Sequence, residues 1–305
     1  LDGTPHSAAA VRPMRLPRLT LIDLVIFAAV IAGVAYVGYR VETVLIYKWD
    51  WSVIPNYLFR WDEGQGSYVP NLLIKGLATT IRIAIWTMLV ASIIGIILGV
   101  ARTSNRLFPR LVSWAYVEFI RNIPPVPFLF LFYFFIASQI MPLLGIDEAI
   151  NGASPGTLAV AEFLFGPANL MTNFAAGVIS LSMMSAAYIA EIIRAGIQAV
   201  PKGQREAGQS IGLSRLALMR YVVLPQAIAR VVPPLAGQFI TLIKDSSLVA
   251  LISIQELSFM AMEIAISEQR FFEVWIVTGA MYFVVCYACA LMFGQLERRI
   301  GAHMR

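Results

Sequence analysis

The sequence predicts an all-α integral membrane protein with six transmembrane helices. Apolar residues make up 59% of the 305-residue chain and charged residues only 13%, whereas soluble domains carry about 25% charged residues. The apolar residues also gather into long runs, which approach or exceed the ~20 residues that a helix needs to cross the hydrocarbon core. A soluble domain of this composition would leave large apolar patches in water, so we exclude that class.

Six apolar runs are candidate spans. In chain order they cover residues 19–39, 72–101, 111–141, 174–200, 231–254 and 271–296. The third run contains Pro124, Pro125 and Pro127, which remove backbone donors and predict a kink or a break. At membrane depth such a break is tolerated only where protein or a water-filled cavity surrounds it. We therefore expect the third span to line the interior of the bundle.

Lys and Arg residues gather in alternate connections, which predicts the orientation. Fourteen of them lie in the two tails and in the connections after the second and fourth spans: Arg12, Arg15, Arg18, Arg102, Arg106, Arg110, Lys202, Arg205, Arg215, Arg220, Arg230, Arg298, Arg299 and Arg305. The other connections hold three: Lys48, Arg60 and Arg270. Because basic connections stay in the cytoplasm, both termini and the polar segment at 203–225 are predicted to be cytoplasmic. This bias accounts for the net charge of +5 without nucleic acid.

The segments on the other side are less informative. Residues 40–70 are rich in Trp and Tyr, which is typical of a membrane–water interface, and residues 47–58 are expected to form a short helix on the outer surface. Residues 147–173 contain an apolar run at 158–165 that is too short to span; this segment is either a cap on the pathway or a docking surface. Cys286 and Cys289 lie in the last apolar run, and we predict neither a disulfide nor a metal site.

A polar, basic segment at 203–225 separates the fourth and fifth spans. Residues 203–211 are predicted to form a short helix that ends at Gly212, and Ser214 is predicted to cap a second helix that reaches Tyr221, ahead of the fifth span. The first helix carries Ala207, Ser210 and Ile211 on one small face. Such a face allows another protein to approach closely.

The spacing within this segment resembles the EAA loop of ABC importer permeases. Glu206-Ala207-Gly208 is followed after three residues by Gly212, and after nine more by Val222-x-Leu224-Pro225. Gly208 and Val222 depart slightly from the family's Ala and Ile. Three further segments resemble the polar amino acid permeases of the histidine and glutamine type: Glu118-Phe-Ile-Arg121-Asn-Ile-Pro124-Pro125, Tyr188 to Gln204, and Leu242-Ile-Lys244-Asp245-Ser246-Ser247-Leu248.

The resemblance implies a domain organisation and a function. Residues 71–305 would form the five-helix type I permease core, with the coupling loop at 199–230, and residues 1–70 would add a cytoplasmic tail, one helix and an outer segment. The chain would be the permease of an ATP-driven importer of polar amino acids in the bacterial inner membrane. Its expected partners are a cytoplasmic ABC ATPase dimer, a second identical or related permease, and an outer amino-acid-binding protein.

Coupling to the ATPase is assigned by the resemblance to a coupling helix. The residues expected to bear that contact are Gly203, Glu206, Ala207, Gly208, Gly212, Leu224 and Pro225. The sequence contains no Gly-x-x-x-x-Gly-Lys-Ser/Thr phosphate loop. We therefore expect that ATP and Mg are used by the partner ATPase, and that this chain is not an enzyme and binds no cofactor.

Polar residues inside the spans are candidates for the substrate pathway, because intramembrane charge is costly and usually faces the interior. The candidates are Arg121, Asn122, Asp245, Ser246 and Ser247. Mutual pairing that holds the bundle together is an equally good interpretation. For Glu191 and Arg194, three residues apart on one helix, we favour pairing; Arg82 and Glu118 could also pair with each other.

Other classes of membrane protein fit less well. The alternative is an ion-gradient-driven secondary transporter or channel, which the proline-broken helix and the intramembrane charges would suit. No inverted pair of broken helices appears in matching halves, however, and the 203–225 segment has no role in that mechanism. A subunit that only anchors would leave Arg121, Lys244 and Asp245 unexplained.

Overall fold

The computed structural model describes residues 20–44 and 47–302. Of the residues that predict the orientation, Arg12, Arg15, Arg18 and Arg305 lie outside this part, as do the side chains of Arg298 and Arg299. The chain forms two compact units, Leu1–Trp49 and Asp50–Arg305. The division predicted between residues 70 and 71 rests on the family resemblance and stays a prediction, as does the cytoplasmic location of both termini.

The described part of the first unit is dominated by helix α1 (Leu21–Val44). Its first turn is capped reciprocally. The Asp23 carboxylate accepts from the Thr20 backbone N–H at 2.7 Å, and the Thr20 hydroxyl accepts from the Asp23 N–H at 3.3 Å. The span within it has a mean hydropathy of 2.3, and none of its residues is buried. Such a surface requires an apolar solvent or a partner helix, as expected for the first predicted span.

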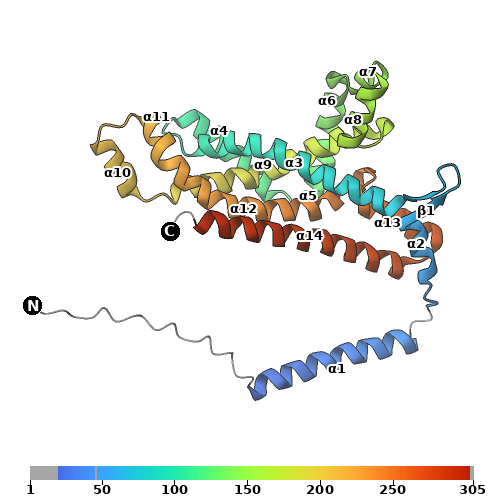
Figure 1. Cartoon of the computed structure of the whole chain (residues 1–305). Helices are drawn as coiled ribbons and strands as arrows, with labels where there is room; N and C mark the ends of the chain where they lie inside the picture. Colours follow the sequence, from blue (N-terminus) through green and yellow to red (C-terminus); the bar gives the residue numbers. More distant parts are fainter. Residues whose placement is uncertain (1–19, 45–46, 303–305) are drawn as a thin grey trace, which may run out of the picture. The chain divides into compact units, whose positions relative to one another are not determined.

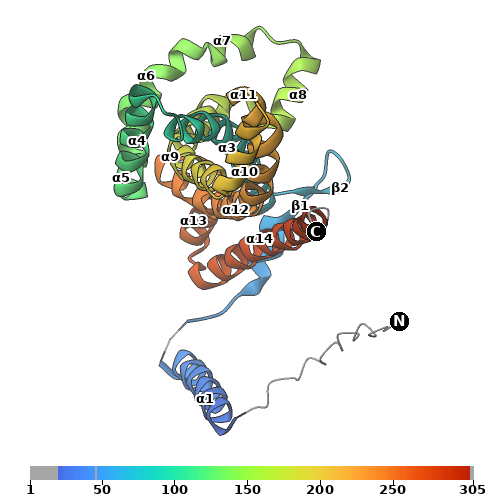
Figure 2. The same cartoon turned by 90° about the vertical axis from the view of Figure 1, so that its left-hand side faces the viewer.

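The second unit is a helix bundle, shown in Figures 1 and 2. Its long helices are α3 (Leu72–Arg102), α9 (Met171–Gln198), α12 (Leu224–Asp245) and α14 (Phe271–Ala302). With α1 and the helical segment at Pro125–Asn151, the described chain has six stretches long and apolar enough to cross a membrane. The prediction of six spans is confirmed.

Helices α3 and α9 make a close contact through two glycines. A Cβ on Gly95 would lie 2.6 Å from Ile189 Cγ2, and one on Gly99 would lie 2.7 Å from the Ala190 carbonyl oxygen. The two glycines are four residues apart and lie on one face of α3. This is the small-xxx-small spacing that lets membrane helices approach closely.

The predicted break in the third span is present. Helix α4 (Leu107–Asn122) ends before Pro124, and α5 (Pro125–Leu131) begins after it. A π-helical stretch (Phe132–Ala137), α6 (Ser138–Ile140) and a 3-10 turn (Met141–Leu144) continue the chain. The span therefore covers Pro125–Asn151 and not 111–141, because the prolines divide the predicted helix. Phe128 and Leu129 are buried in the main core. Only 22% of the most apolar stretch of this span is buried, however, and Leu131, Phe134 and Phe135 are exposed. The expectation that the third span lines the interior of the bundle is therefore not confirmed.

An excursion at 141–170 leaves the bundle sideways (Figures 1 and 2). It contains α7 (Ile146–Asn151), α8 (Pro155–Phe165) and a 3-10 turn (Ala168–Leu170). Arg82 Nε donates to the Phe163 carbonyl at 2.9 Å, and Trp86 Nε1 donates to that of Leu164 at 3.1 Å. These bonds satisfy carbonyls that α8 leaves free at its C-terminal end. The possible pairing of Arg82 with Glu118 is therefore not formed.

The end of the bundle near residue 60 holds one element that the sequence predicted and a hairpin that it did not. A 3-10 turn (Trp51–Val53) and α2 (Ile54–Leu58) form the short helix expected at 47–58. Strands β1 (Phe59–Asp62) and β2 (Ser67–Pro70) then form an antiparallel hairpin in which Trp61 pairs with Tyr68. Their rings meet edge to face with centroids 5.2 Å apart. Such aromatic cross-strand pairs stabilise a hairpin.

Helix α13 (Leu257–Glu268) is a further unpredicted element, and a buried carboxylate caps it. Glu256 accepts from the Phe259 N–H at 2.9 Å, from the Tyr282 hydroxyl at 2.6 Å and from the Thr80 hydroxyl at 3.0 Å. Burial raises the pKa of the Glu256 carboxyl, against the lowering effect of these hydrogen bonds. Three elements, α3, α13 and α14, thus meet at one side chain.

Candidate functional site

The connection between α9 and α12 forms the predicted short helix, α10 (Lys202–Ser210). It ends at Gly212, whose φ of +82° is readily reached only by glycine. The Leu213 N–H donates to the Gly208 carbonyl at 3.1 Å, and the Gly212 N–H donates to that of Gln209 at 2.9 Å. This pair of bonds is a Schellman motif, so the predicted role of Gly212 as a helix stop is confirmed.

Two residues of α10 attach it to the bundle. Gly208 is buried, and a Cβ there would lie 2.5 Å from Leu218 Cδ1. The Arg205 guanidinium donates to the Ile197 carbonyl at 2.6 Å, near the C-terminal end of α9. Arg205 and Gly208 are three positions apart in α10, and both face the bundle. Gly208, one of the predicted coupling residues, therefore packs α10 against Leu218 and does not lie on the exposed face of the helix.

The opposite face of α10 is open. Gly203, Glu206, Ala207 and Ser210 recur at the three- and four-residue spacing of one helix face, and all four are exposed. Ile211, just beyond the helix, is 78% exposed. This face lies at the end of the bundle from which α10 projects, and the C-terminal part of α14 reaches the same end (Figure 1).

The rest of the predicted loop departs from expectation. Ser214 caps α11 (Arg215–Leu218) as predicted, by accepting from the Ala217 N–H at 3.3 Å. The helix does not stop at Tyr221, however. A π-helical stretch (Met219–Val223) joins α11 to α12, and Pro225 lies directly after it, in the first turn of α12. Leu224 and Pro225 are exposed on this continuous helix.

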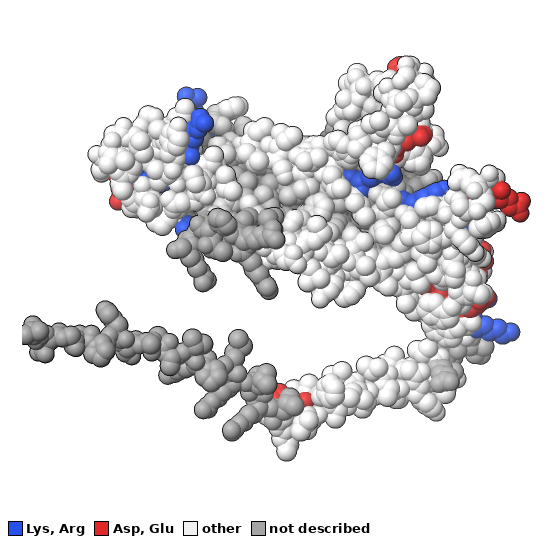
Figure 3. Space-filling model, in the orientation of Figure 1, with Lys and Arg blue, Asp and Glu red and all other residues white. Residues whose placement is uncertain are grey.

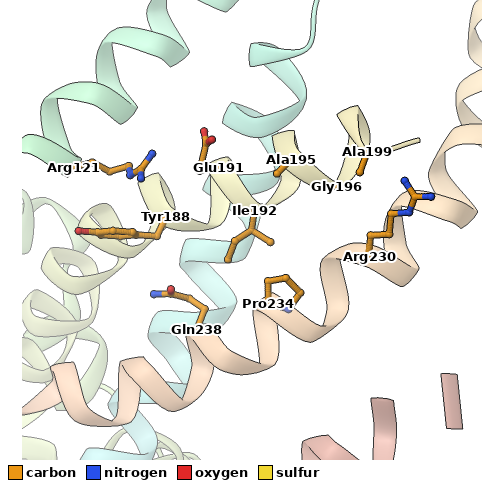
Figure 4. A pocket seen from close by; sticks show the side chains of 10 residues that line it. All are labelled: Arg121, Tyr188, Glu191, Ile192, Ala195, Gly196, Ala199, Arg230, Pro234 and Gln238. Carbon is orange, nitrogen blue, oxygen red and sulfur yellow. The ribbon is translucent and has the colours of Figure 1, made fainter. Parts of the chain in front are cut away.

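A cavity of about 450 Å³ lies between α4, α9 and α12 (Figure 4). Arg121 enters from the end of α4, and its guanidinium lies 5.8 Å from the centre of the Tyr188 ring. From α9 come Tyr188, Glu191 and small residues; from α12 come Arg230, Pro234 and Gln238. In Figure 4, Gln238 points from α12 towards α9. The lining thus presents two cations, one carboxylate and an amide.

Glu191 belongs to an ion-pair network behind this cavity. It accepts from Arg194 of its own helix, with Nε at 2.9 Å, so the predicted pairing is confirmed. It also accepts from Arg102 of α3 at 2.9 Å. Arg102 lies 3.4 Å from Glu118 of α4 as well. From the sequence, Arg102 served only to predict orientation, but in the structure its ion pairs connect α3 with α4 and α9.

The other predicted pathway residues do not line this cavity. The Asn122 amide donates to the Glu118 carbonyl at 2.7 Å, within its own helix. The hydroxyls of Ser246 and Ser247 donate to the carbonyls three residues before them, at 2.8 and 2.7 Å. Asp245 is half-buried at the end of α12, seven residues or roughly 10 Å beyond Gln238. Arg121 is thus the one candidate in the cavity, and the remaining four lie elsewhere.

Metal chemistry has no support in the described residues. No group of three or more His, Cys, Asp or Glu side chains within 20–44 and 47–302 is arranged to hold a metal ion. Cys286 and Cys289 are both free thiols.

Comparison with known proteins establishes the family. Residues 91–302 match the family described as "Binding-protein-dependent transport system inner membrane component". The chain belongs to this family. It is a multi-pass inner membrane protein, and the family match decides against a gradient-driven secondary transporter or channel.

Individual relatives agree with this assignment. The chain is 32% identical over 253 residues to the glutamine transport system permease protein GlnP of Escherichia coli (strain K12), with 83% of this chain and 98% of that protein covered. It is 34% identical over 232 residues to the probable amino-acid ABC transporter permease protein YckA of Bacillus subtilis (strain 168), covering 76% and 90%.

Two solved structures resemble the fold. One is a chain of an amino acid ABC transporter crystallised with histidines, at 30% identity and a TM-score of 0.64, with 83% of this chain and 100% of that chain covered. Another is a chain of the inward-facing MetNI methionine ABC transporter, at 18% identity and a TM-score of 0.57. At that identity the second likeness concerns the fold alone.

Proposed function

We propose that this chain is the permease subunit of an ATP-driven importer of polar amino acids, coupled to its ATPase through α10. The observation that carries the proposal is the exposed face of α10, which has the spacing of the EAA loop and projects from one end of the bundle (Figure 1). The names of the relatives support the substrate class, since they include glutamine and glutamate/aspartate permeases.

The attachment of α10 suggests how ATP is coupled to the pathway. Gly203, Glu206 and Ala207 contact the cytoplasmic ABC ATPase dimer, while Gly208 and Arg205 hold α10 to α11 and α9. A movement imposed on α10 is thereby passed to the helices that form the walls of the cavity. ATP and Mg are used by the partner ATPase, because this sequence contains no Gly-x-x-x-x-Gly-Lys-Ser/Thr phosphate loop.

The cavity between α4, α9 and α12 fits a zwitterionic amino acid. Its volume of about 450 Å³ lies within the range of small-molecule sites, roughly 300–1,000 Å³. Arg121 and Arg230 suit the α-carboxylate, since guanidinium groups bind carboxylates with paired N–H donors. Glu191 suits the ammonium group, and Gln238 can bond a polar side chain. Asp245, Ser246 and Ser247 would act further along the pathway towards the binding protein.

Isolation of the complex tests the coupling role. The tagged chain is purified in mild detergent from its native membrane, and the proteins that accompany it are identified by mass spectrometry. We expect an ABC ATPase, a second permease copy or relative, and a soluble binding protein. Glu206→Arg should lose the ATPase, because it reverses a charge on the exposed face of α10.

Gln204→Arg is the matched control. Gln204 is also exposed on α10, but it lies two residues before Glu206 and about 160° around the helix from it. If both variants kept the ATPase, α10 would not be the coupling element. If no ATPase accompanied the folded wild-type chain, the importer assignment itself would fail.

A further inference from the structure

A second, basic pocket of about 430 Å³ opens between the adjacent ends of α3, α4 and α9. Its lining is Arg102, Arg110, Leu111, Trp114, Arg194 and Gln198. We propose that this pocket binds the phosphate headgroup of an anionic phospholipid from the leaflet at the α10 end of the bundle. Figure 3 shows Lys and Arg side chains exposed at that end, near the start of α4.

The charges of the pocket favour an anion. Its lining contains three arginines and no carboxylate. Arg102 and Arg194 share Glu191, and Arg102 reaches Glu118 at 3.4 Å. Arg110 is exposed and forms no ion pair with the described part of the chain. The Arg110 guanidinium is thus available, and guanidinium groups bind phosphate oxygens through paired charge-assisted hydrogen bonds.

The apolar part of the pocket favours a lipid over a free ion. Leu111 is 49% and Trp114 52% exposed, on the same turns of α4 as Arg110. One turn earlier, Leu107 and Phe108 are 60% and 78% exposed. An acyl chain can cover this apolar strip while its phosphate reaches the arginines. Tryptophan at headgroup depth is typical of such a position.

The predicted orientation supplies the lipid. The connection that contains Arg102, Arg106 and Arg110 is one of the basic segments that predict the cytoplasmic side. Anionic phospholipids give the cytoplasmic leaflet its negative surface potential. The pocket therefore faces the leaflet in which a negatively charged headgroup is abundant.

Lipid at this position would act on the neighbouring cavity. Arg102 and Arg194 line the basic pocket, and both hold Glu191, which lines the cavity of Figure 4. A phosphate that bonds these arginines competes with the Glu191 carboxylate for the same donors. Anionic lipid would thereby change how firmly Glu191 is held, whatever solute the cavity carries.

Lipid retention measures the binding. The chain is purified with its accompanying subunits, and bound phosphatidylglycerol and phosphatidylcholine are counted by native mass spectrometry after exchange into defined mixtures of the two. We expect Arg110→Gln to weaken phosphatidylglycerol retention about fivefold, the effect of one basic residue at an anionic surface. Arg106→Gln is the control, since Arg106 is exposed in the same connection and does not line the pocket.

Quenching by brominated lipids locates the site. Brominated phosphatidylglycerol should quench tryptophan emission more than brominated phosphatidylcholine does, and Trp114→Phe should remove that excess. Equal retention by Arg110→Gln and Arg106→Gln would overturn the proposal. So would full displacement of the lipid by millimolar inorganic phosphate, which would identify a site for the free ion. Loss of the ATPase subunit from Arg110→Gln, with lipid retention unchanged, would identify a protein contact instead.

Discussion

The contact between α3 and α9 yields a quantitative prediction for Gly99→Ala. The new methyl group would lie 2.6 Å from Ile193 Cβ and 2.7 Å from the Ala190 carbonyl oxygen. Carbon atoms pack best at 3.5–4.0 Å, so the helices must separate by about 1 Å at this point. Neither neighbour is the end of a flexible side chain, and relief by rotation about a side-chain bond is therefore excluded.

The expected cost follows from overpacking. Extra methyl groups in a well-packed core cost about 1–3 kcal/mol, and a separation of 0.5–1 Å forfeits a quarter to a half of the attraction between the atoms concerned. At roughly 2–4 °C per kcal/mol for domains of 150–250 residues, Gly99→Ala should lower the melting temperature in detergent by roughly 2–12 °C. Gly95→Ala should behave alike, because its Cβ would lie 2.6 Å from Ile189.

The assay is thermal unfolding in detergent, followed by size-exclusion chromatography after heating. Gly279→Ala serves as the control, since Gly279 lies in α14 and a Cβ there would meet nothing within 4 Å. Because alanine has a better helix propensity than glycine, Gly279→Ala should leave the free energy of unfolding unchanged or raise it by up to about 1 kcal/mol. If Gly99→Ala were as stable as Gly279→Ala, close approach through these glycines would not hold α3 against α9.

Variants at three positions, Glu256, Arg102 and Asp245, address polar side chains within the bundle. Glu256→Ala should cost about 2–4 kcal/mol by removing a helix cap and the acceptor of buried hydroxyls, whereas Glu256→Gln keeps an acceptor. Because burial raises the pKa of Glu256, wild-type thermal stability should fall as pH rises above about 4.5, and Glu256→Gln should lack this component. Arg102→Ala should lower the free energy of unfolding by about 1–3 kcal/mol, measured by thermal unfolding. Replacement of the exposed Arg106 by Ala should lower it by less than about 0.5 kcal/mol. Asp245→Ala should reduce transport in vesicles more than expression; equal losses would indicate a structural role.

Much of the fold could be predicted because the bilayer imposes length and hydropathy on a spanning helix. Residues 72–101 and 271–296 match α3 and α14 closely, and the prolines after Ile123 mark a real break. The motif spacing likewise placed α10 and its stop at Gly212. These features are local, since each depends on neighbouring residues in the chain.

The missed features depend on contacts between distant segments. The hairpin at 59–70 is stabilised by the pairing of Trp61 with Tyr68, which an aromatic-rich interface segment does not reveal. Helix α13 depends on Glu256, whose partners Thr80 and Tyr282 are 176 and 26 residues away. The Gly95-xxx-Gly99 spacing was readable in the sequence, but its partner helix was not. Periodicity alone cannot identify such partners.

Helix α9 connects the features on which the proposed mechanism depends. Its C-terminal end receives the Arg205 side chain of α10, and its Gly196 lies where a Cβ would be 2.2 Å from Val231 of α12. Five residues before Gly196, Glu191 lines the cavity and also pairs with Arg102 in the ion-pair network. A force on α10 therefore cannot move α9 without also displacing α12 and changing the environment of Glu191. Because Gly95 and Gly99 hold α3 against residues 186–193 of α9, the response should be a tilt of α9 about that contact and not a translation along it.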